Sequence, residues 1–138
     1  MLDLDCKVLK LLHRSQEPLK VGDIAKALDI PHSTTGSCIK RLEYEKHVEY
    51  DRYNVVKLTD SGKSLAIELI RHSQLMEVLL YHELGLTVEL AHDESEKLNL
   101  LFSCEVINKI CEKYNHPSKC PCGHDILSSG TCYCEKKH

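Results

Sequence analysis

The chain has 138 residues, a formal net charge of −3 at pH 7, and 28% charged against 5% aromatic residues. It can bury one fair-sized core or two small ones, and the absence of an apolar run of roughly 18 residues excludes a membrane-spanning helix. The first ten residues lack the charged-then-apolar order of a signal peptide, so we expect a cytoplasmic protein with no membrane partner. Eight cysteines in such a protein favour metal or redox chemistry over disulfides.

Residues 2–14 are predicted to form a first helix, and a proline at position 18 ends it. Residues 21–45 then predict two short helices joined by a tight turn. The turn is placed at Pro31, because proline disfavours the helical region for the residue before it. Hydroxyl side chains at positions 33–35 are N-cap candidates for the second helix. This layout is that of a helix-turn-helix, whose second helix enters the DNA major groove.

The outer face of that second helix carries small hydroxyl and cationic side chains, which suit base edges and phosphates. Residues 47–59 alternate apolar and polar side chains and predict a two-stranded hairpin, which would be a wing. Gly36 inside the helix costs about 1 kcal/mol relative to alanine, which a close approach to the duplex would explain. The predicted DNA contacts are Ser33, Thr34, Thr35, Ser37, Lys40 and Arg41, with Arg52 and Tyr53 at the wing tip. A helical hairpin used only for packing is the alternative.

Three further helices are predicted after the wing. The first spans about residues 61–84 and ends at Gly85, the second is capped near Thr87 and runs to about 101, and the third is capped by Ser103 and runs to about 114. The predicted fold class is therefore mainly α. A winged helix-turn-helix occupies residues 1–63, a helical dimerisation and metal-sensing domain follows at 64–115, and residues 116–138 form a Cys-rich metal-binding tail.

The tail contains two close pairs of cysteines that are separated by nine residues. Four thiolates brought together by a short loop suit tetrahedral Zn²⁺, or iron in a cluster. The predicted tail ligands are Cys120, Cys122, Cys132 and Cys134. Incidental thiols in a disordered tail, or a disulfide switch, are the alternatives. Elsewhere Cys6, Cys38, Cys104 and Cys111 are expected to be small buried hydrophobes, although the last two share a helix face and could contribute to a metal site.

The order of these elements resembles the DtxR/MntR class of metal-dependent transcriptional repressors. The segments that carry the resemblance are residues 19–50, 55–66, 75–86 and 116–123. The resemblance implies a homodimer that binds palindromic operator double-stranded DNA. It also implies a divalent transition metal, Zn, Fe or Mn, bound between the two domains as corepressor.

The resemblance further implies ligand positions, and the chain departs from some of them. Ser73 stands where the family has a histidine, with His72 one residue earlier, and Leu100 stands at a ligand position although leucine cannot bind a metal. Asp3 or Asp5 would be the acidic ligand of the first helix. The implied interdomain set is Asp5, His72, Glu77, His92 and Glu96, with Asn99 as a further candidate. Solvated surface residues are the alternative.

These departures suggest the hypothesis that sensing has moved toward the four cysteines of the tail. Two rival functions remain open: an iron–sulfur or thiol redox sensor on the same scaffold, and a winged-helix protein-interaction module with structural zinc. The sequence has no Gly-rich phosphate loop and no convincing nucleophile–base pair, so we expect neither an enzyme nor a small-molecule substrate.

Overall fold

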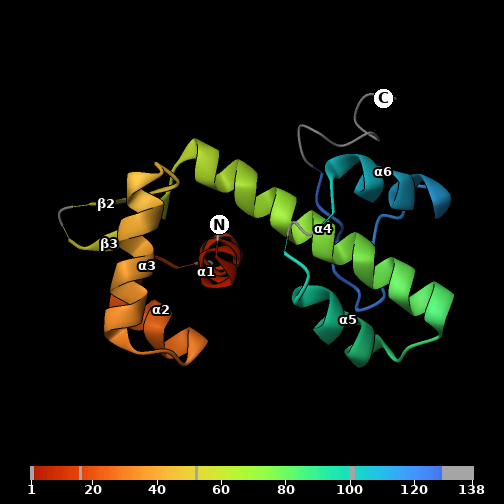
Figure 1. Ribbon diagram of the computed structural model, residues 1–138, viewed down its shortest axis with the longest axis horizontal. Coiled ribbons are helices and arrows are strands. Elements are labelled where there is room, and N and C mark those ends of the chain that lie inside the picture. The colour runs from red at the N-terminus through yellow and green to blue at the C-terminus, as the bar shows by residue number, and fades with distance from the viewer. Residues whose placement is uncertain (1, 16, 52, 100–101, 129–138) are drawn as a thin grey trace. The chain divides into compact units, whose positions relative to one another are not determined.

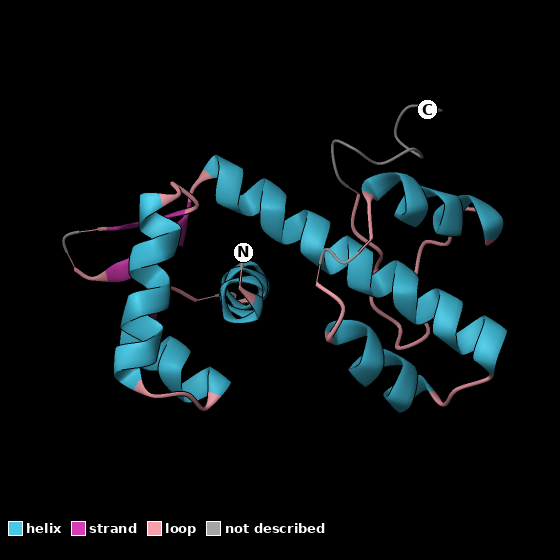
Figure 2. Ribbon diagram, viewed as in Figure 1, coloured by secondary structure: helices cyan, strands magenta, loops and turns pink. Residues whose placement is uncertain are grey.

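The computed structural model describes residues 2–15, 17–51, 53–99 and 102–128. The chain forms two compact units, Met1–Ala66 and Ile67–His138, and the boundary between them falls within one long helix (Figure 1). The described residues are mainly helical with one small antiparallel sheet, which confirms the predicted fold class (Figure 2). None of the helices in the described ranges combines the length and the apolar character needed to cross a bilayer.

The first unit is a helix-turn-helix followed by a hairpin. Its elements in chain order are α1 (Asp3–Arg14), β1 (Leu19–Lys20), α2 (Val21–Leu28), α3 (His32–Tyr44), β2 (Val48–Tyr50) and β3 (Val55–Leu58). The hairpin pairs Glu49 with Lys57 across β2 and β3. The short strand β1, which the sequence pattern did not predict, pairs antiparallel with the other edge of β3, so the strand order is β1-β3-β2.

The core of the first unit lies where α1, α2 and α3 meet. Its fully buried apolar side chains are Val8, Leu9, Ile24, Cys38, Ile39 and Leu42. Helix α1 contacts α2, α3 and β3 and thereby covers the inward face of α3. The apolar residues Cys38, Ile39 and Leu42 of α3 are buried against this core, so the opposite face of α3 is left to the solvent.

The turn between α2 and α3 differs from the predicted one at the N-terminal cap of α3. Asp29 adopts a left-handed conformation with φ of 53° and ends α2, its N–H bonding to carbonyls of that helix. The N-cap of α3 is Pro31, which has no capping side chain. The expected hydroxyl cap at residues 33–35 is therefore wrong, because those residues already lie inside the helix.

The second unit is built around α4 (Asp60–Leu84), with α5 (Val88–Glu96) and α6 (Cys104–Lys113). Gly85 follows α4 with φ of 64°, and the hydroxyls of Thr87 and Ser103 cap α5 and α6 as predicted. Helix α5 ends at Glu96, short of the predicted end near residue 101. The core cluster contains Leu75, Met76, Ile107, Ile110 and Cys111, and Ile126 from the segment after α6 packs against it.

Candidate functional site

The outward face of α3 carries a row of small polar side chains. Gly36 lies within this row, and a side chain added there would meet no atom within 4 Å. Thr35, by contrast, is fully buried, and its hydroxyl donates to the Pro31 carbonyl at 3.1 Å. Thr35 faces inward because it shares a helix face with the buried Cys38 and Ile39, which corrects its place among the predicted contacts. The exposed members of the predicted contact set on α3 are Ser33, Thr34, Ser37 and Lys40.

Arg41 forms an ion pair with the buried carboxylate of Asp5 and does not extend freely into solvent. Its Nη2 atom lies 2.9 Å from Oδ1 of Asp5, which also accepts from the Cys38 thiol at 3.0 Å, while Oδ2 accepts from the Leu2 N–H. Burial opposes ionisation of Asp5, but the hydrogen bonds from Cys38 and Arg41 outweigh it and hold the pKa of this carboxyl below its usual value. Burial and the neighbouring carboxylate raise the pKa of Cys38 to about 12.

This arrangement bears on two predicted roles. Asp5, expected as a metal ligand, uses both of its oxygens within the first unit. Arg41, expected as a DNA contact, is tied by the same carboxylate to α1, although its side chain remains 40% exposed. Lys40 is therefore the fully outward cation of the predicted set on α3.

The wing tip is shaped by Asp51, whose Oδ1 accepts the N–H groups of Tyr53 at 2.8 Å and Val55 at 3.1 Å. Asn54 supplies the left-handed residue of the turn, with φ of 62°. Tyr53 projects from this tip with 63% of its surface exposed. The other predicted wing contact, Arg52, lies outside the described residues.

A buried carboxylate in α4 forms the centre of the second unit's polar cluster. Glu77 is 2% exposed, and its Oε1 lies 3.0 Å from Nδ1 of His92 on α5. Its Oε2 accepts the backbone N–H of Cys122 at 2.9 Å, and the Cys122 thiol lies 3.5 Å from Oε1. A buried carboxylate is costly unless it is paired or bound to a cation, so this cluster needs positive charge.

The segment after α6 is fixed against α4 by hydrogen bonds from Gln74. The amide of Gln74 donates to the carbonyl of Asp125 at 2.7 Å, and its oxygen accepts the N–H of Leu127 at 2.9 Å. Within the segment, the N–H of Cys120 bonds to the carbonyl of His124 at 2.9 Å, which closes a tight turn at Gly123 with φ of 95°. These hydrogen bonds thus place the segment that contains Cys120 and Cys122 against α4, the helix that contains Glu77.

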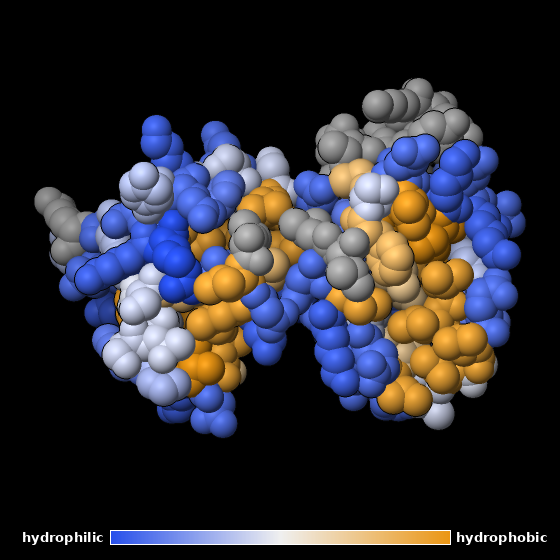
Figure 3. Space-filling model, viewed as in Figure 1, coloured by the Kyte–Doolittle hydropathy of each residue, from blue (hydrophilic) through white to orange (hydrophobic). Residues whose placement is uncertain are grey.

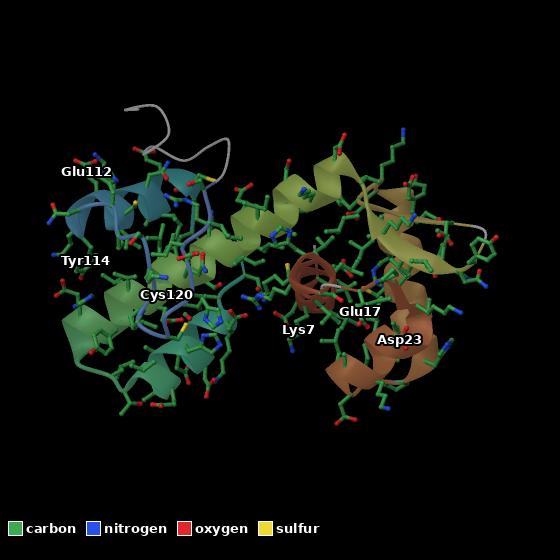
Figure 4. All side chains as sticks on the ribbon, turned by 180° about the vertical axis from the view of Figure 1, so that it is seen from behind. Lys7, Glu17, Asp23, Glu112, Tyr114 and Cys120 are labelled. Carbon is green, nitrogen blue, oxygen red and sulfur yellow. The ribbon has the colours of Figure 1, made fainter. Side chains whose placement is uncertain are left out.

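The turn brings three soft or borderline ligands together. The Cys122 sulfur lies 3.0 Å from the Cys120 sulfur and 3.1 Å from Nδ1 of His124. Figure 4 shows Cys120 on this segment, close to α4. Burial, together with hydrogen bonds to Cys120 and Glu77, raises the pKa of the Cys122 thiol to about 12. Cys122 belongs both to the group with Cys120 and His124 and to the group with Glu77 and His92. The five side chains therefore form one continuous donor set, defined here as the α4–α5–loop cluster: Glu77, His92, Cys120, Cys122 and His124.

The structure separates several predicted ligands from this cluster. Glu96, expected to share an ion with His92, instead accepts from the hydroxyl of Ser73 at 3.5 Å. His72 lies with Glu68 and Cys104, in a different group. The predicted tail ligands Cys132 and Cys134 lie outside the described residues.

His124 joins the cluster although it was not among the predicted ligands. The signal was present in the sequence, because Cys120, Cys122 and His124 alternate at every second residue. Ligand-type side chains spaced this closely come within reach of one ion when a tight turn, here at Gly123, folds the segment.

Two family models match the chain. Residues 59–128 match the model described as iron dependent repressor, metal binding and dimerisation domain, and residues 6–52 match the IclR helix-turn-helix domain. The first match contains all five residues of the α4–α5–loop cluster, and the second contains α2 and α3.

Known proteins show the same likeness along most of the chain. The chain is 31% identical over 105 residues to the iron-dependent repressor IdeR of Mycobacterium tuberculosis, covering 75% of this chain and 45% of IdeR. It is 26% identical over 110 residues to the transcriptional regulator MntR of Oceanobacillus iheyensis, covering 80% of this chain and 74% of MntR. The crystal structure of ScaR with bound Zn²⁺ matches with a TM-score of 0.80 and 28% identity, over 91% of this chain and 60% of that chain. The chain thus spans about half the length of IdeR.

Proposed function

Because this chain belongs to the iron-dependent repressor family, we propose that it is a transcriptional regulator that binds operator DNA as a homodimer and responds to a divalent transition metal. The observation that carries the proposal is the buried carboxylate of Glu77. It faces an imidazole and a thiol, which are metal ligands, and none of the described lysines or arginines forms an ion pair with it.

The proposed metal ligands are members of the α4–α5–loop cluster. Glu77, His92 and Cys122 are the inner ligands, because their donor atoms converge and Glu77 is buried. Cys120 and His124 extend the set from the loop side. A bound divalent ion would neutralise the buried carboxylate and tie α4, α5 and the loop together, since these ligands come from all three segments.

The donor set favours one kind of ion over others. Thiolate and imidazole ligands select Zn²⁺ or Fe²⁺, whereas Mn²⁺ prefers carboxylate and other oxygen ligands. Iron–sulfur clusters are held mainly by four cysteines, whereas the α4–α5–loop cluster contains two, Cys120 and Cys122. We therefore propose a single bound Zn²⁺ or Fe²⁺ at this site, with Mn²⁺ the weaker candidate.

The proposed DNA interface is the exposed row on α3, together with the wing. Small side chains at Ser33, Thr34 and Gly36 allow the helix backbone to come close to the groove, and Lys40 offers a cation to phosphate or guanine. In a homodimer, two copies of α3 would meet successive turns of the major groove when they lie about 34 Å apart.

The proposed dimer contact lies on the second unit. Apolar side chains gather on one of its surfaces, around the C-terminal end of α4 (Figure 3). The exposed large apolar residues of this unit are Tyr81, Leu84, Leu90, Phe102 and Val106. Exposed apolar side chains that gather on one surface mark a candidate protein–protein contact.

The metal part of the proposal is tested by elemental analysis of protein purified without oxygen. We expect about one equivalent of metal at this site in the wild type, and a loss of that equivalent in Cys122→Ser. Glu89→Gln is the matched control, because Glu89 is an exposed carboxylate on the helix that carries His92. Equal metal content in the wild type and Cys122→Ser would overturn this assignment.

The DNA part is tested by a salt titration of binding to duplex DNA that the metal-loaded protein has selected from a random library. Binding through phosphate contacts weakens steeply as salt rises, because counterions are released. Duplex binding that is undetectable at low salt would favour a protein-interaction module instead.

A further inference from the structure

A second group of metal-binding side chains lies on α4 and α6, apart from the α4–α5–loop cluster. Glu68 and His72 are one turn apart on α4, and Cys104 is the first residue of α6. The Cys104 sulfur lies 2.7 Å from Oε1 of Glu68 and 3.6 Å from Nε2 of His72. The same Nε2 lies 3.8 Å from Oε1 of Glu68, so the three donor atoms converge on one point.

The buried imidazole is the most informative member of this group. His72 is 3% exposed, and within the described part of the chain no hydrogen-bond partner lies at its Nδ1 atom. The other ring nitrogen, Nε2, faces the Cys104 sulfur and the Glu68 carboxylate, so it is the nitrogen placed to act as a ligand. Burying an incompletely bonded imidazole costs free energy, and an apolar residue would pack there more cheaply. A metal bond at Nε2 would not give Nδ1 a partner, but its free energy would offset the cost of burying the ring.

The Cys104 thiol donates to Glu68, and a cation bound between the two would take the place of that proton. A thiolate at the first residue of a helix is favoured by the positive end of the helix dipole. Cys104 and Glu68 are both partly exposed, which gives an ion a path to the buried ring. Thiolate, imidazole and carboxylate are the three side-chain types that bind Zn²⁺ in proteins, and an exposed fourth position is typical of open zinc sites.

We propose that Glu68, His72 and Cys104 form a second metal site that takes Zn²⁺ or a similar thiophilic divalent cation, with water as the fourth ligand. The site shares no residue with the α4–α5–loop cluster. His72 and Glu77 are five positions apart on α4, so their side chains leave the helix about 140° apart around its axis. An ion at the second site ties α6 to α4, whereas one at the first ties α5 and the loop to α4.

The proposal is tested with Co²⁺ as a spectroscopic substitute for Zn²⁺, because a thiolate bound to cobalt gives a charge-transfer absorption band. The reference protein is the full chain with the tail thiols replaced: Cys120→Ser, Cys122→Ser, Cys132→Ser and Cys134→Ser. We expect this reference to bind about one equivalent of Co²⁺ with a charge-transfer band, and Zn²⁺ to displace it.

Adding Cys104→Ser to the reference should abolish the band and the bound equivalent. Adding Cys111→Ser should leave both unchanged, because Cys111 lies on the same helix but belongs to the core cluster. A folded reference with no thiolate band, or a band that survives Cys104→Ser, would overturn the proposal.

A second comparison covers the case in which the reference does not fold. Cys104→Ser in the otherwise unchanged chain should lose one cobalt equivalent relative to the wild type, and an unchanged stoichiometry counts against the site. Neither measurement uses DNA, so the outcome is independent of the proposed regulatory function.

Discussion

A side chain at Gly62 would collide with the chain that leads into the wing. A Cβ atom built there lies 1.8 Å from the carbonyl oxygen of His47 and 2.8 Å from its carbonyl carbon. Ordinary contact begins near 3.4 Å, so Gly62→Ala must push the two backbones apart by about 1.6 Å. Backbone atoms cannot swing aside as a flexible side chain can, so the strain falls on the hydrogen bonds of the junction.

Those bonds join the start of α4 to the connection between α3 and β2. The N–H of Thr59 donates to the His47 carbonyl at 3.1 Å, the N–H of Gly62 donates to the Thr59 hydroxyl at 3.1 Å, and that hydroxyl donates to the Lys46 carbonyl at 2.6 Å. Overpacking costs about 1–3 kcal/mol, and each lost hydrogen bond about 1 kcal/mol. We expect Gly62→Ala to lower the free energy of unfolding by about 3 kcal/mol.

The assay is urea denaturation followed by circular dichroism, with Gly36→Ala as the matched control. Gly36 also lies in a helix but has open space around it, so alanine there should raise the free energy of unfolding by about 1 kcal/mol. The reasoning is refuted if Gly62→Ala is as stable as the wild type, or if both substitutions shift stability in the same direction.

Three other predictions follow from the two units. Gly36→Ala should weaken duplex binding while stabilising the fold, because the added methyl group stands on the exposed face of α3; unchanged affinity in an anisotropy titration would contradict the close approach. Lys40→Ala should reduce the slope of log affinity against log salt by about 0.9, whereas Lys26→Ala on α2 should leave the slope unchanged. The lowered pKa of Asp5 means that its ionised form stabilises the fold above its ordinary value of 3.8, and that this contribution is lost as pH falls through the lower, folded value. Asp5→Asn should therefore be less stable than the wild type at pH 7, and the difference should shrink on acidification; a difference that is constant with pH would count against this account.

Local patterns in the sequence were sufficient for much of the first unit. The apolar spacing of α2 and α3 and the alternation of the wing follow from helix and strand periods, which act within a few residues. The inward position of Thr35 could have been found from the same period, since it lies one turn before Cys38 and Ile39. Strand β1 could not, because two residues carry no period and their pairing with β3 depends on a distant partner.

The candidate metal site shows where sequence reasoning ended. Glu77 and His92 were predicted as ligands, and so was Cys122, but they were assigned to two separate sites. Their meeting depends on Gln74, which holds the loop against α4 across more than fifty residues of sequence. Contacts of that range arise from tertiary packing, and spacing along the chain does not encode them. For the same reason His72 could be recognised as a candidate ligand without its partner Cys104.

The measurement that tests the central claim most directly is duplex affinity with and without metal, in the wild type and in Cys122→Ser. The DNA is a duplex selected by the metal-loaded wild type, and binding is followed by fluorescence anisotropy after chelation and after addition of Zn²⁺ or Fe²⁺. Control of DNA binding by the α4–α5–loop cluster predicts a wild type whose affinity rises with metal and a Cys122→Ser variant whose affinity does not respond. A wild type that binds equally well in both states, or a variant with the full metal response, would contradict it.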